Sequence, residues 1–455
     1  MRGRVPTLLA FAAGLASLAL VVTAAARPVV TKEGVLPPGT ELNEEPLDQP
    51  TELFYSELAG GKRSYLLNLG DLLFSSPDIF GGVARQGGIS CATCHQQGHN
   101  NAKLFIPGLS KRPGTFDTTG ALFNPKADNG VFDPVRVPSL RGAKYLAPYA
   151  HDGRFGTLRD FIHNAIVNEF AGPEPSAQVL DALENYVKEI AFLPNPKLAA
   201  GGRLSAEASD AARRGEMLFV KPFRRDASMS CASCHRPDGA FVDHQPHDVG
   251  SGGLFKTPTL LNADFNAPYF HDGRFDSYVE VVGYFDTHFD LGLSKDEQSD
   301  LVAYLDAVGN AKNPLTRDSV EAELAEIEQF VGVLDTAIPA HDKEIISLTV
   351  NEVGREWREL GECFPAHSDT SVTGGIAERL KAREAVRETV LTLRQIDMAA
   401  ADGDFAGAAQ ILDNYRQQLA YVTDDLKTAE AWSLFNPAVR EAHFAALGKL
   451  VTLAK

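Results

Sequence analysis

The stretches that decide the fold are Cys91-Ala-Thr-Cys-His95 and Cys231-Ala-Ser-Cys-His235. Each is a Cys-x-x-Cys pair followed directly by histidine, the attachment signature of a c-type haem. Two thiols bond to the vinyl groups on one porphyrin edge, and the next residue binds the iron. We therefore predict two covalent haems, with His95 and His235 as iron ligands. The four predicted attachment cysteines are Cys91, Cys94, Cys231 and Cys234.

Zinc half-sites and redox-active thiol pairs are the alternatives for these motifs. A zinc site made of four thiolates does not need a histidine after each pair. The fifth cysteine, Cys363, lies in an apolar helical stretch and is interpreted as a buried thiol. Five cysteines in 455 residues are too few for a disulfide framework.

Related segments surround both motifs, which indicates an internal duplication. In the first copy, "NLGDLLF" (68–74) precedes the motif and "RVPSLRGAKYLAPYAHDGRF" (136–155) follows it. The second copy has "RRGEMLF" (213–219) and "KTPTLLNADFNAPYFHDGRF" (256–275). The first copy carries additional residues rich in Gly, Pro and Asn, at 108–130, which we expect to form a surface loop.

Apolar residues at helical spacing predict that each copy ends in an amphipathic helix, over 180–190 and 301–308. A Ser294–Glu297 capping box precedes the second of these. Further apolar stripes after residue 314 predict a bundle of four or five helices. The predicted fold is mainly α, with two tandem cytochrome c-type haem domains followed by a C-terminal helical bundle.

We divide the chain into five parts on this basis. The parts are a signal peptide (1–26), a linker (27–52), an N-terminal haem domain (53–200), a C-terminal haem domain (201–314) and the bundle (315–455).

The N-terminus has the pattern of a secretory signal. Arg2 and Arg4 precede an apolar run over 8–22, and small residues for cleavage follow at 24–26. An uncleaved anchor is the alternative, although the run is shorter than a bilayer span requires. We predict export, to the periplasm in a Gram-negative host, with no membrane span after cleavage.

The net charge of −17, from 43 basic and 60 acidic residues, argues against a nucleic-acid partner. Binding of phosphates needs a basic face. Much of the negative charge falls in the predicted bundle, where a solvated acidic surface is expected. A docking surface for a basic partner is the alternative.

Methionine is scarce at the positions where it would complete the iron coordination. The four methionines are Met1, Met217, Met229 and Met398. None follows a haem motif at the distance from which a sixth ligand usually comes. The sixth position of each iron is therefore expected to hold His or Tyr, or to stay open.

The paired haem motifs, each followed by "PSL" or "PTL" and then by "APY-x-HDGRF", resemble the bacterial di-haem cytochrome c peroxidases and the related MauG enzymes. The resemblance covers about residues 53–313 and leaves out the predicted bundle. It implies that the N-terminal haem reacts with peroxide and that the C-terminal haem stores or passes electrons.

The resemblance also implies an acidic residue on the distal side of the N-terminal haem. Glu169 in "IVNEF" takes this position after the "HDGRF" loop. Such a carboxylate takes one proton from peroxide and delivers it to the leaving oxygen. A surface glutamate is the alternative. The family's distal glutamine position holds Phe161 here, with His163 close by.

For the C-terminal haem, the family has Met or Tyr as sixth ligand, about 14 residues after the loop histidine. Tyr284 lies one residue before that position, and His288 is a second candidate. We prefer Tyr284, whose alternative role is that of a core aromatic. Either ligand would lower the iron potential relative to methionine.

Two positions depart from the family pattern. His151 stands where the family has a tryptophan between the haems, so His151 is a candidate for catalysis or electron transfer and, alternatively, a structural residue. Arg136 stands where an asparagine usually binds calcium between the domains. A calcium ion is thus in question, because the arginine can supply the positive charge.

The leading functional prediction is an exported oxidoreductase that reduces hydrogen peroxide with electrons from a small cytochrome c or cupredoxin. Glu169 and His151 are its predicted catalytic residues. The first alternative is a MauG-like enzyme that oxidises Trp or Tyr of a partner protein. The second is a non-catalytic di-haem electron-transfer cytochrome.

Overall fold

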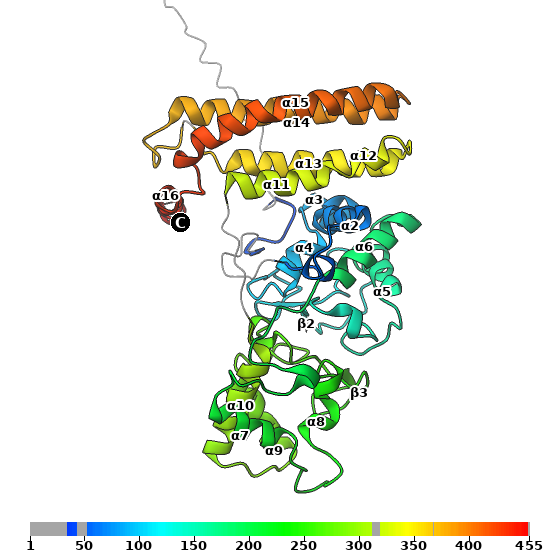
Figure 1. The fold of residues 1–455 in the computed structure, drawn as a ribbon, viewed down its shortest axis with the longest axis vertical. Helices are drawn as coiled ribbons and strands as arrows, with labels where there is room; N and C mark the ends of the chain where they lie inside the picture. The colour runs from blue at the N-terminus through cyan, green and yellow to red at the C-terminus, as the bar shows by residue number, and fades with distance from the viewer. Residues whose placement is uncertain (1–33, 43–51, 312–318, 367, 454–455) are drawn as a thin grey trace, which may run out of the picture.

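A computed structural model describes residues 34–42, 52–311, 319–366 and 368–453. The described chain is mainly helical, as the sequence predicts, and forms an elongated stack (Figure 1). The second haem-motif copy lies at one end, the first copy in the middle, and the C-terminal helices at the other end. Within the described ranges, no helix has the length and apolarity needed to cross a membrane.

The two copies use corresponding helices. The first copy contains α1 (Tyr55–Leu58), α2 (Tyr65–Ser75), α3 (Gly82–Gln86), α4 (Cys91–Cys94), α5 (Leu158–Asn164), a π-helix (Ala165–Glu169) and α6 (Ala177–Glu189). The second contains α7 (Asp210–Phe219), α8 (Cys231–Cys234), α9 (Tyr278–His288) and α10 (Lys295–Gly309).

Short antiparallel ribbons and single helical turns join these helices. β1 (Thr115–Phe116) pairs with β2 (Val135–Arg136), and β3 (Pro246–His247) pairs with β4 (Phe255–Lys256). The 3-10 turns are Pro77–Ile79, Gln96–Gly98, Ala143–Tyr145, Ala200–Gly202, Pro237–Gly239, Ala263–Phe265 and Glu430–Trp432.

The predicted closing helices of both copies are confirmed as α6 and α10. The Ser294 side chain accepts from the backbone N–H of Glu297, and the Glu297 carboxylate accepts from the Ser294 N–H. This reciprocal pair is the predicted capping box, which satisfies donors that a helix start leaves unpaired.

Glycines let α2 approach α6 in the first copy and α7 approach α10 in the second. A Cβ added at Gly70 in α2 would lie 2.2 Å from the Ala182 carbonyl oxygen of α6. A Cβ at Gly215 in α7 would lie 2.0 Å from the Asp300 carbonyl oxygen of α10. The same small-residue contact therefore holds both crossing pairs together, as the duplication leads one to expect.

The additional residues of the first copy are more buried than a surface loop. Phe116 and Phe123 are each 4% exposed, and both rings pack on Phe170 at centroid separations of 6.0 and 5.4 Å. The expectation of a surface loop is thus wrong for this part. The phenylalanines bury apolar area that outweighs the Gly, Pro and Asn content of the stretch.

The C-terminal helices form two layers. The bundle consists of α11 (Val320–Val331), α12 (Leu334–Ala337), α13 (Lys343–Glu362), α14 (Ile376–Ala401), α15 (Phe405–Ala429) and α16 (Pro437–Leu453). α11 and α13 contact α2 of the first copy, and α14 and α15 lie on their outer side (Figure 1). The described bundle thus has five longer helices and one short one.

A charged cluster on α13 joins the bundle to the first copy. Arg355 of α13 donates to the Ser75 carbonyl at the end of α2, at 2.8 Å, and pairs with Glu352 and Glu356. Glu352 is 1% exposed. The expected solvated acidic surface therefore does not include Glu352, which forms part of the contact between domains.

The N-terminal segments are described only in part. The predicted signal peptide lies outside the described residues, as do 27–33 and 43–51 of the predicted linker. Leu36 is buried, and Glu41 pairs with Phe105 through backbone hydrogen bonds of 2.8 Å in both directions. This part of the predicted linker thus packs against the first copy.

Gly70→Ala is expected to destabilise the first copy by about 1–3 kcal/mol, because the added methyl overlaps the backbone of α6. The measurement is denaturant unfolding of the haem-loaded chain. Gly283→Ala in α9 is the control, since its Cβ would meet nothing within 4 Å. Equal destabilisation by both variants would contradict the close approach of α2 and α6.

Candidate active site

Both Cys-x-x-Cys motifs form a single helical turn with the same cap. The Ser90 N–H donates to the Thr93 hydroxyl at 3.0 Å, and the Ser230 N–H donates to the Ser233 hydroxyl at 2.9 Å. The turn brings both thiols of a motif to one region, and the histidine follows at its C-terminal end. The residue before each pair and the one inside it thus set the local conformation.

The histidines of the two motifs are oriented as iron ligands would be. His95 Nδ1 lies 2.9 Å from the Pro138 carbonyl oxygen, and His235 Nδ1 lies 3.2 Å from the Phe241 carbonyl oxygen. A carbonyl only accepts, so Nδ1 carries the proton and Nε2 keeps its lone pair. Burial lowers the pKa of His95 to about 4 and also lowers that of His235. Both rings are neutral, as metal binding requires.

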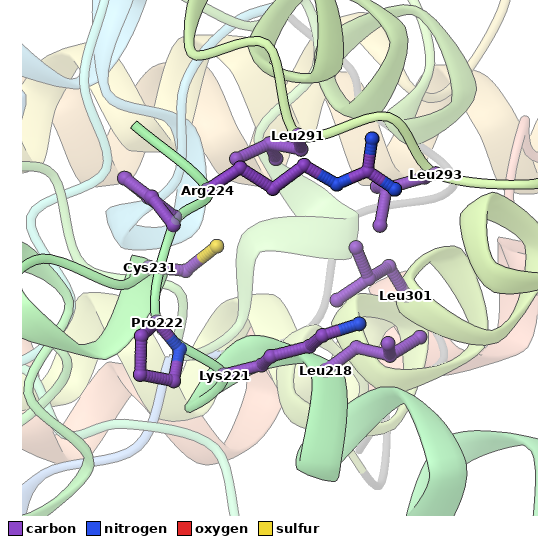
Figure 2. A pocket seen from close by; sticks show the side chains of 9 residues that line it. Leu218, Lys221, Pro222, Arg224, Cys231, Leu291, Leu293 and Leu301 are labelled. Atoms are coloured by element: carbon purple, nitrogen blue, oxygen red, sulfur yellow. The ribbon is translucent and has the colours of Figure 1, made fainter. Parts of the chain in front are cut away.

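The thiols have surroundings that suit a flat apolar macrocycle. Cys91, Cys94, Cys231 and Cys234 form no disulfide, and burial raises the pKa of each. The Cys231 sulfur points into a pocket with leucines on its walls (Figure 2). Those leucines are Leu218, Leu291, Leu293 and Leu301. Lys221 and Arg224 also line this pocket. Neutral imidazoles and paired thiols in both copies, with leucines beside Cys231, therefore fit haem c in this chain.

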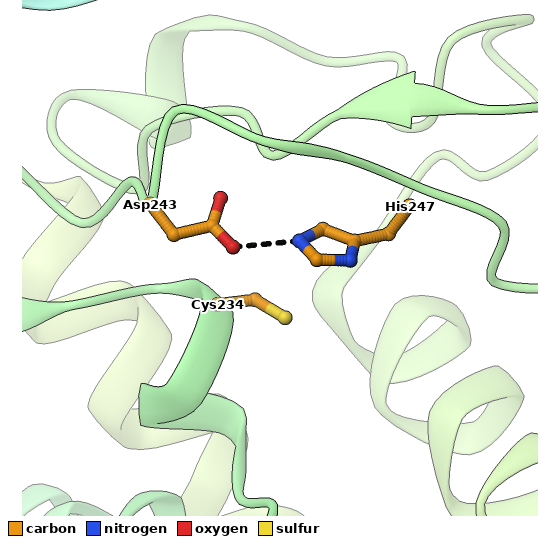
Figure 3. Close-up of side chains that lie close together, drawn as sticks. All are labelled: Cys234, Asp243 and His247. Atoms are coloured by element: carbon orange, nitrogen blue, oxygen red, sulfur yellow. Dashed lines mark hydrogen bonds and ion pairs between the residues drawn. The ribbon is translucent and has the colours of Figure 1, made fainter.

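A carboxylate and an imidazole lie beside Cys234. His247 Nε2 is 2.6 Å from an Asp243 carboxylate oxygen, and both groups come near the Cys234 sulfur (Figure 3). These three ligand atoms lie within 4.8 Å of one another. A thioether to haem would use up the thiolate, which leaves the Asp243–His247 pair at the edge of the second haem site.

Glu169 ends the π-helix that continues α5, and its side chain is 10% exposed. It accepts a hydrogen bond of 2.9 Å from the Asn164 amide and lies 3.9 Å from the Arg154 guanidinium. Burial raises the pKa of Glu169 to about 7, against the lowering effects of Arg154 and Asn164. Its charge in turn raises the pKa of the Cys94 thiol, so the carboxyl lies near the first haem motif.

The sequence did not reveal the polar neighbour of Glu169. His163, which is close to the family's glutamine position in the sequence, is more exposed and pairs with Glu174 at 2.8 Å. Asn164 takes the position instead, because the π-turn brings residues five apart into contact. In the sequence, the only indication is that Asn164 precedes Glu169 by five residues. A regular α-helix does not bring residues at this spacing into contact, so the pair is not predictable from helical periodicity.

The additional loop of the first copy forms one wall around Glu169. The Asn124 amide donates to the Asn168 carbonyl at 2.5 Å, and Phe116 and Phe123 pack on Phe170. These contacts hold the residues on both sides of Glu169. The stretch predicted as a surface loop is therefore part of the site.

The two copies exchange hydrogen bonds in both directions. The Arg136 N–H donates to the His271 carbonyl at 2.6 Å, and the Lys256 N–H donates to the His151 carbonyl at 2.7 Å. The Arg136 guanidinium also donates to the Asn266 carbonyl at 3.2 Å. Corresponding loops of the duplication thus meet at this contact.

His151 lies in this contact between the copies. Its Nε2 is 2.6 Å from the Arg136 carbonyl oxygen. Its ring is also near enough to His271 that a positive charge on His271 lowers the pKa of His151. Burial lowers the pKa of His151 to about 3, with further lowering by Arg136. The ring is neutral and is fixed by a backbone oxygen.

Tyr284 and His288 lie together on one face of α9. Their rings stack at 5.7 Å between centroids, and both approach Gly250. The Tyr284 hydroxyl donates to the Val249 carbonyl at 2.6 Å. Gly250 has φ +75°, and a Cβ there would lie 2.8 Å from the His288 ring. A glycine is required for this close approach.

Comparisons with known proteins agree with the haem motifs. Residues 209–351 match the family model of the di-haem cytochrome c peroxidases, a segment that runs beyond residue 313 into α13. MauG of Methylorubrum extorquens is 25% identical, over 53% of this chain and 77% of its own length. Cytochrome c551 peroxidase of Pseudomonas aeruginosa is 35% identical, over 22% of this chain and 30% of its own length.

A third relative has a different name. Hydrazine synthase subunit gamma of Kuenenia stuttgartiensis is 26% identical, over 58% of this chain and 83% of its own length. A solved structure of the Kuenenia stuttgartiensis hydrazine synthase aligns with a TM-score of 0.41 at 23% identity, covering 58% of this chain and 95% of that one.

The family model and the named relatives confirm the resemblance stated from the sequence. The matched family is named for its two haems, and the relatives are named as oxidoreductases. Residues 209–351 thus match the di-haem cytochrome c peroxidase family, and the chain is similar to oxidoreductases named MauG and cytochrome c peroxidase.

Proposed function

We propose that this protein is an exported di-haem peroxidase that reduces hydrogen peroxide in the periplasm. A small cytochrome c or cupredoxin supplies the electrons. The observation that carries the proposal is Glu169, a largely buried carboxyl beside the first haem motif, in a copy whose counterpart has Phe289 at the same position. A buried carboxyl at this position can accept and donate a proton.

Haem c supplies, when bound, an iron that can accept a peroxide oxygen. Cys91 and Cys94 tether it, and the His95 ring presents Nε2 because the Pro138 carbonyl holds Nδ1–H. In the second copy Cys231 and Cys234 tether the haem, and His235 presents its Nε2 in the same way. Each pair of cysteines would hold its haem beside the histidine of the same motif.

Glu169 moves the proton in this proposal. Its carboxylate would take a proton from one oxygen of hydrogen peroxide and deliver it to the other, which would leave as water, and a bound haem would supply the two electrons for cleavage of the O–O bond. With a pKa of about 7, the Glu169 carboxyl exists in both its protonated and its ionised form near neutral pH. Asn164 orients the carboxyl, and the loop that carries Phe116 and Phe123 limits entry of water.

The contact between the copies provides the route for electrons. His151 and His271 lie there, and corresponding backbone groups join the loops that carry them. We propose that electrons pass from the second haem to the first across this contact. His151 acts in it as a neutral positioning residue, held by the Arg136 carbonyl.

The proposed site has its own substitute for calcium between the domains. The Lys256 ammonium donates to the carbonyl oxygens of Leu146 and Pro148 at 2.6 and 2.5 Å, and the Arg136 guanidinium donates to that of Asn266. Carbonyl oxygens are the ligands that calcium prefers. Two side-chain cations already take these oxygens, so we propose a calcium-independent contact.

A MauG-like oxidation of Trp or Tyr on a partner protein is the second candidate. Tyr284 favours it, because a tyrosine at this point of α9 corresponds to the family's MauG pattern. The ring lies against Gly250 and donates to the Val249 carbonyl. We propose Tyr284 as the sixth ligand of the second haem, with His288 as the alternative.

The first prediction concerns covalent attachment. Full-length protein from a host that matures c-type cytochromes is expected to carry two haems, and a Cys91→Ser/Cys94→Ser variant one. Denaturing mass spectrometry and a pyridine haemochrome assay measure this. A Cys363→Ser control should keep both haems. An unchanged haem count in the double variant would contradict the assignment.

The second prediction concerns Glu169. Glu169→Gln is expected to slow the reaction with peroxide by about 10²–10⁴-fold, since the amide cannot accept the proton. In the unmodified protein the rate should rise with pH through about 7, as the carboxylate forms, and the variant should lose this rise. Stopped-flow spectroscopy measures both.

Glu174→Gln is the control for this measurement, because Glu174 is a more exposed acid near the same helix. It should leave the rate and its pH profile unchanged. A Glu169→Gln variant with the rate of the unmodified protein would support a non-catalytic electron-transfer cytochrome instead.

The third prediction separates the ligand candidates for the second haem. If Tyr284 binds as phenolate, Tyr284→Phe should raise the reduction potential of that haem, since a negative ligand is lost. Spectropotentiometric titration measures the shift. An unchanged potential in Tyr284→Phe together with a changed one in His288→Ala would assign the ligand to His288.

A further inference from the structure

We propose that Tyr186 is a redox-active site that gives an electron to the haem held by His95, while Glu52 takes the phenolic proton. The site lies on the side of the first copy that faces the bundle. It goes beyond peroxide reduction, because it stores one oxidising equivalent on the protein.

The proton has an acceptor already in place. The Tyr186 hydroxyl donates to a Glu52 carboxylate oxygen at 2.6 Å, and its side chain is 1% exposed. The buried Asp71 carboxyl also interacts with this hydroxyl. Two carboxyls therefore converge on a phenol that is shielded from water.

The electron has a short path through aromatic rings. The Tyr186 ring lies 4.9 Å from that of Phe74 between centroids, and the Phe74 ring lies 6.4 Å from that of His95. Phe74 lies in the last turn of α2, and Tyr186 comes from α6. One intervening ring therefore separates the tyrosine from the iron ligand.

The chemistry of phenol oxidation explains why both features are needed. Loss of an electron alone leaves a strongly acidic phenol cation, so the proton must leave at the same time. In the proposed step the Tyr186 O–H bond breaks, and an O–H bond forms on Glu52. The electron goes to a haem oxidised by hydrogen peroxide, the co-reactant. The products are a neutral tyrosyl radical and a carboxylic acid.

The protonation states of the pair agree with this geometry. Burial raises the pKa of Glu52 to about 7, so the carboxyl can hold either form near neutral pH. Burial and the two carboxyls raise the pKa of Tyr186, which keeps the phenol protonated until it is oxidised.

The bundle closes this site. Arg63 pairs with Asp71 and also donates to the Gln329 amide oxygen of α11 at 2.6 Å. Arg355 of α13 donates to the carbonyl of Ser75, the residue after Phe74. α11 and α13 therefore contact the residues around Tyr186, through Arg63 beside Asp71 and through Ser75 beside Phe74. The bundle thus helps to shield the phenol from water.

The second copy provides a natural comparison. Tyr304 packs on Phe219 at 4.8 Å, and Phe219 lies 6.4 Å from the His235 ring, which repeats the aromatic path. The Tyr304 hydroxyl donates to no carboxylate within the described parts of the chain. The ring stack thus belongs to the duplicated fold, whereas the proton acceptor occurs in the copy proposed to react with peroxide.

The inference rests on the proposed function for its oxidant, and one experiment separates the two. The haem-loaded full-length chain, labelled with ring-deuterated tyrosine or unlabelled, is mixed with hydrogen peroxide and freeze-quenched. Optical spectra report the haem reaction, and EPR reports organic radicals. We expect a radical signal that narrows on deuteration and that is lost in Tyr186→Phe but kept in Tyr304→Phe.

Glu52→Gln supplies a second test that leaves the tyrosine in place. It should diminish the radical signal while the optical reaction of the haem persists. A haem that reacts normally with an unchanged radical in Tyr186→Phe overturns the inference alone. A haem that does not react overturns the proposed function as well. Circular dichroism checks the fold of each variant, and Glu52→Gln decides the question if Tyr186→Phe does not fold.

Discussion

A hydrogen bond between an imidazole and a backbone carbonyl links haem binding to the rest of this structure. His95 Nδ1 lies 2.9 Å from the Pro138 carbonyl, which fixes the ring and leaves Nε2 for iron. Pro138 is two residues from Arg136, whose N–H donates to the His271 carbonyl of the other copy. One continuous segment therefore orients the ligand and joins the copies. In the second copy, His235 Nδ1 lies 3.2 Å from the Phe241 carbonyl, whereas Lys256 donates its N–H to the His151 carbonyl of the first copy.

The duplication explains why both copies share the same helices, and the residues that differ between the copies suggest different roles for the two haem sites. Glu169 with its π-turn, and Glu52 beside Tyr186, occur in the first copy. The second copy has an uninterrupted α9 that carries Tyr284 and His288. The carboxyls proposed to move protons, Glu169 and Glu52, thus lie in the first copy, and Tyr284, the proposed ligand, lies in the second. This asymmetry is what one expects when one haem reacts and the other supplies electrons.

Local pattern predicted much of the fold, because helical periodicity and caps act over a few residues. The closing helices, the Ser294 capping box and the bundle follow from such patterns. Tertiary contacts decided the rest. Phe116 and Phe123 of the Gly-rich stretch pack on Phe170, next to Glu169. A π-turn brings Asn164 into contact with Glu169. Glu52 lay at the end of a predicted linker, and only the folded chain brings it to Tyr186.

We propose that a haem bound through His95 would keep a coordination position open for peroxide. EPR of the fully oxidised protein, before and after addition of hydrogen peroxide, measures this. We expect a high-spin ferric signal from one haem that disappears with peroxide, while the other haem gives a distinct signal. Two low-spin signals that peroxide leaves unchanged would show that no position is open.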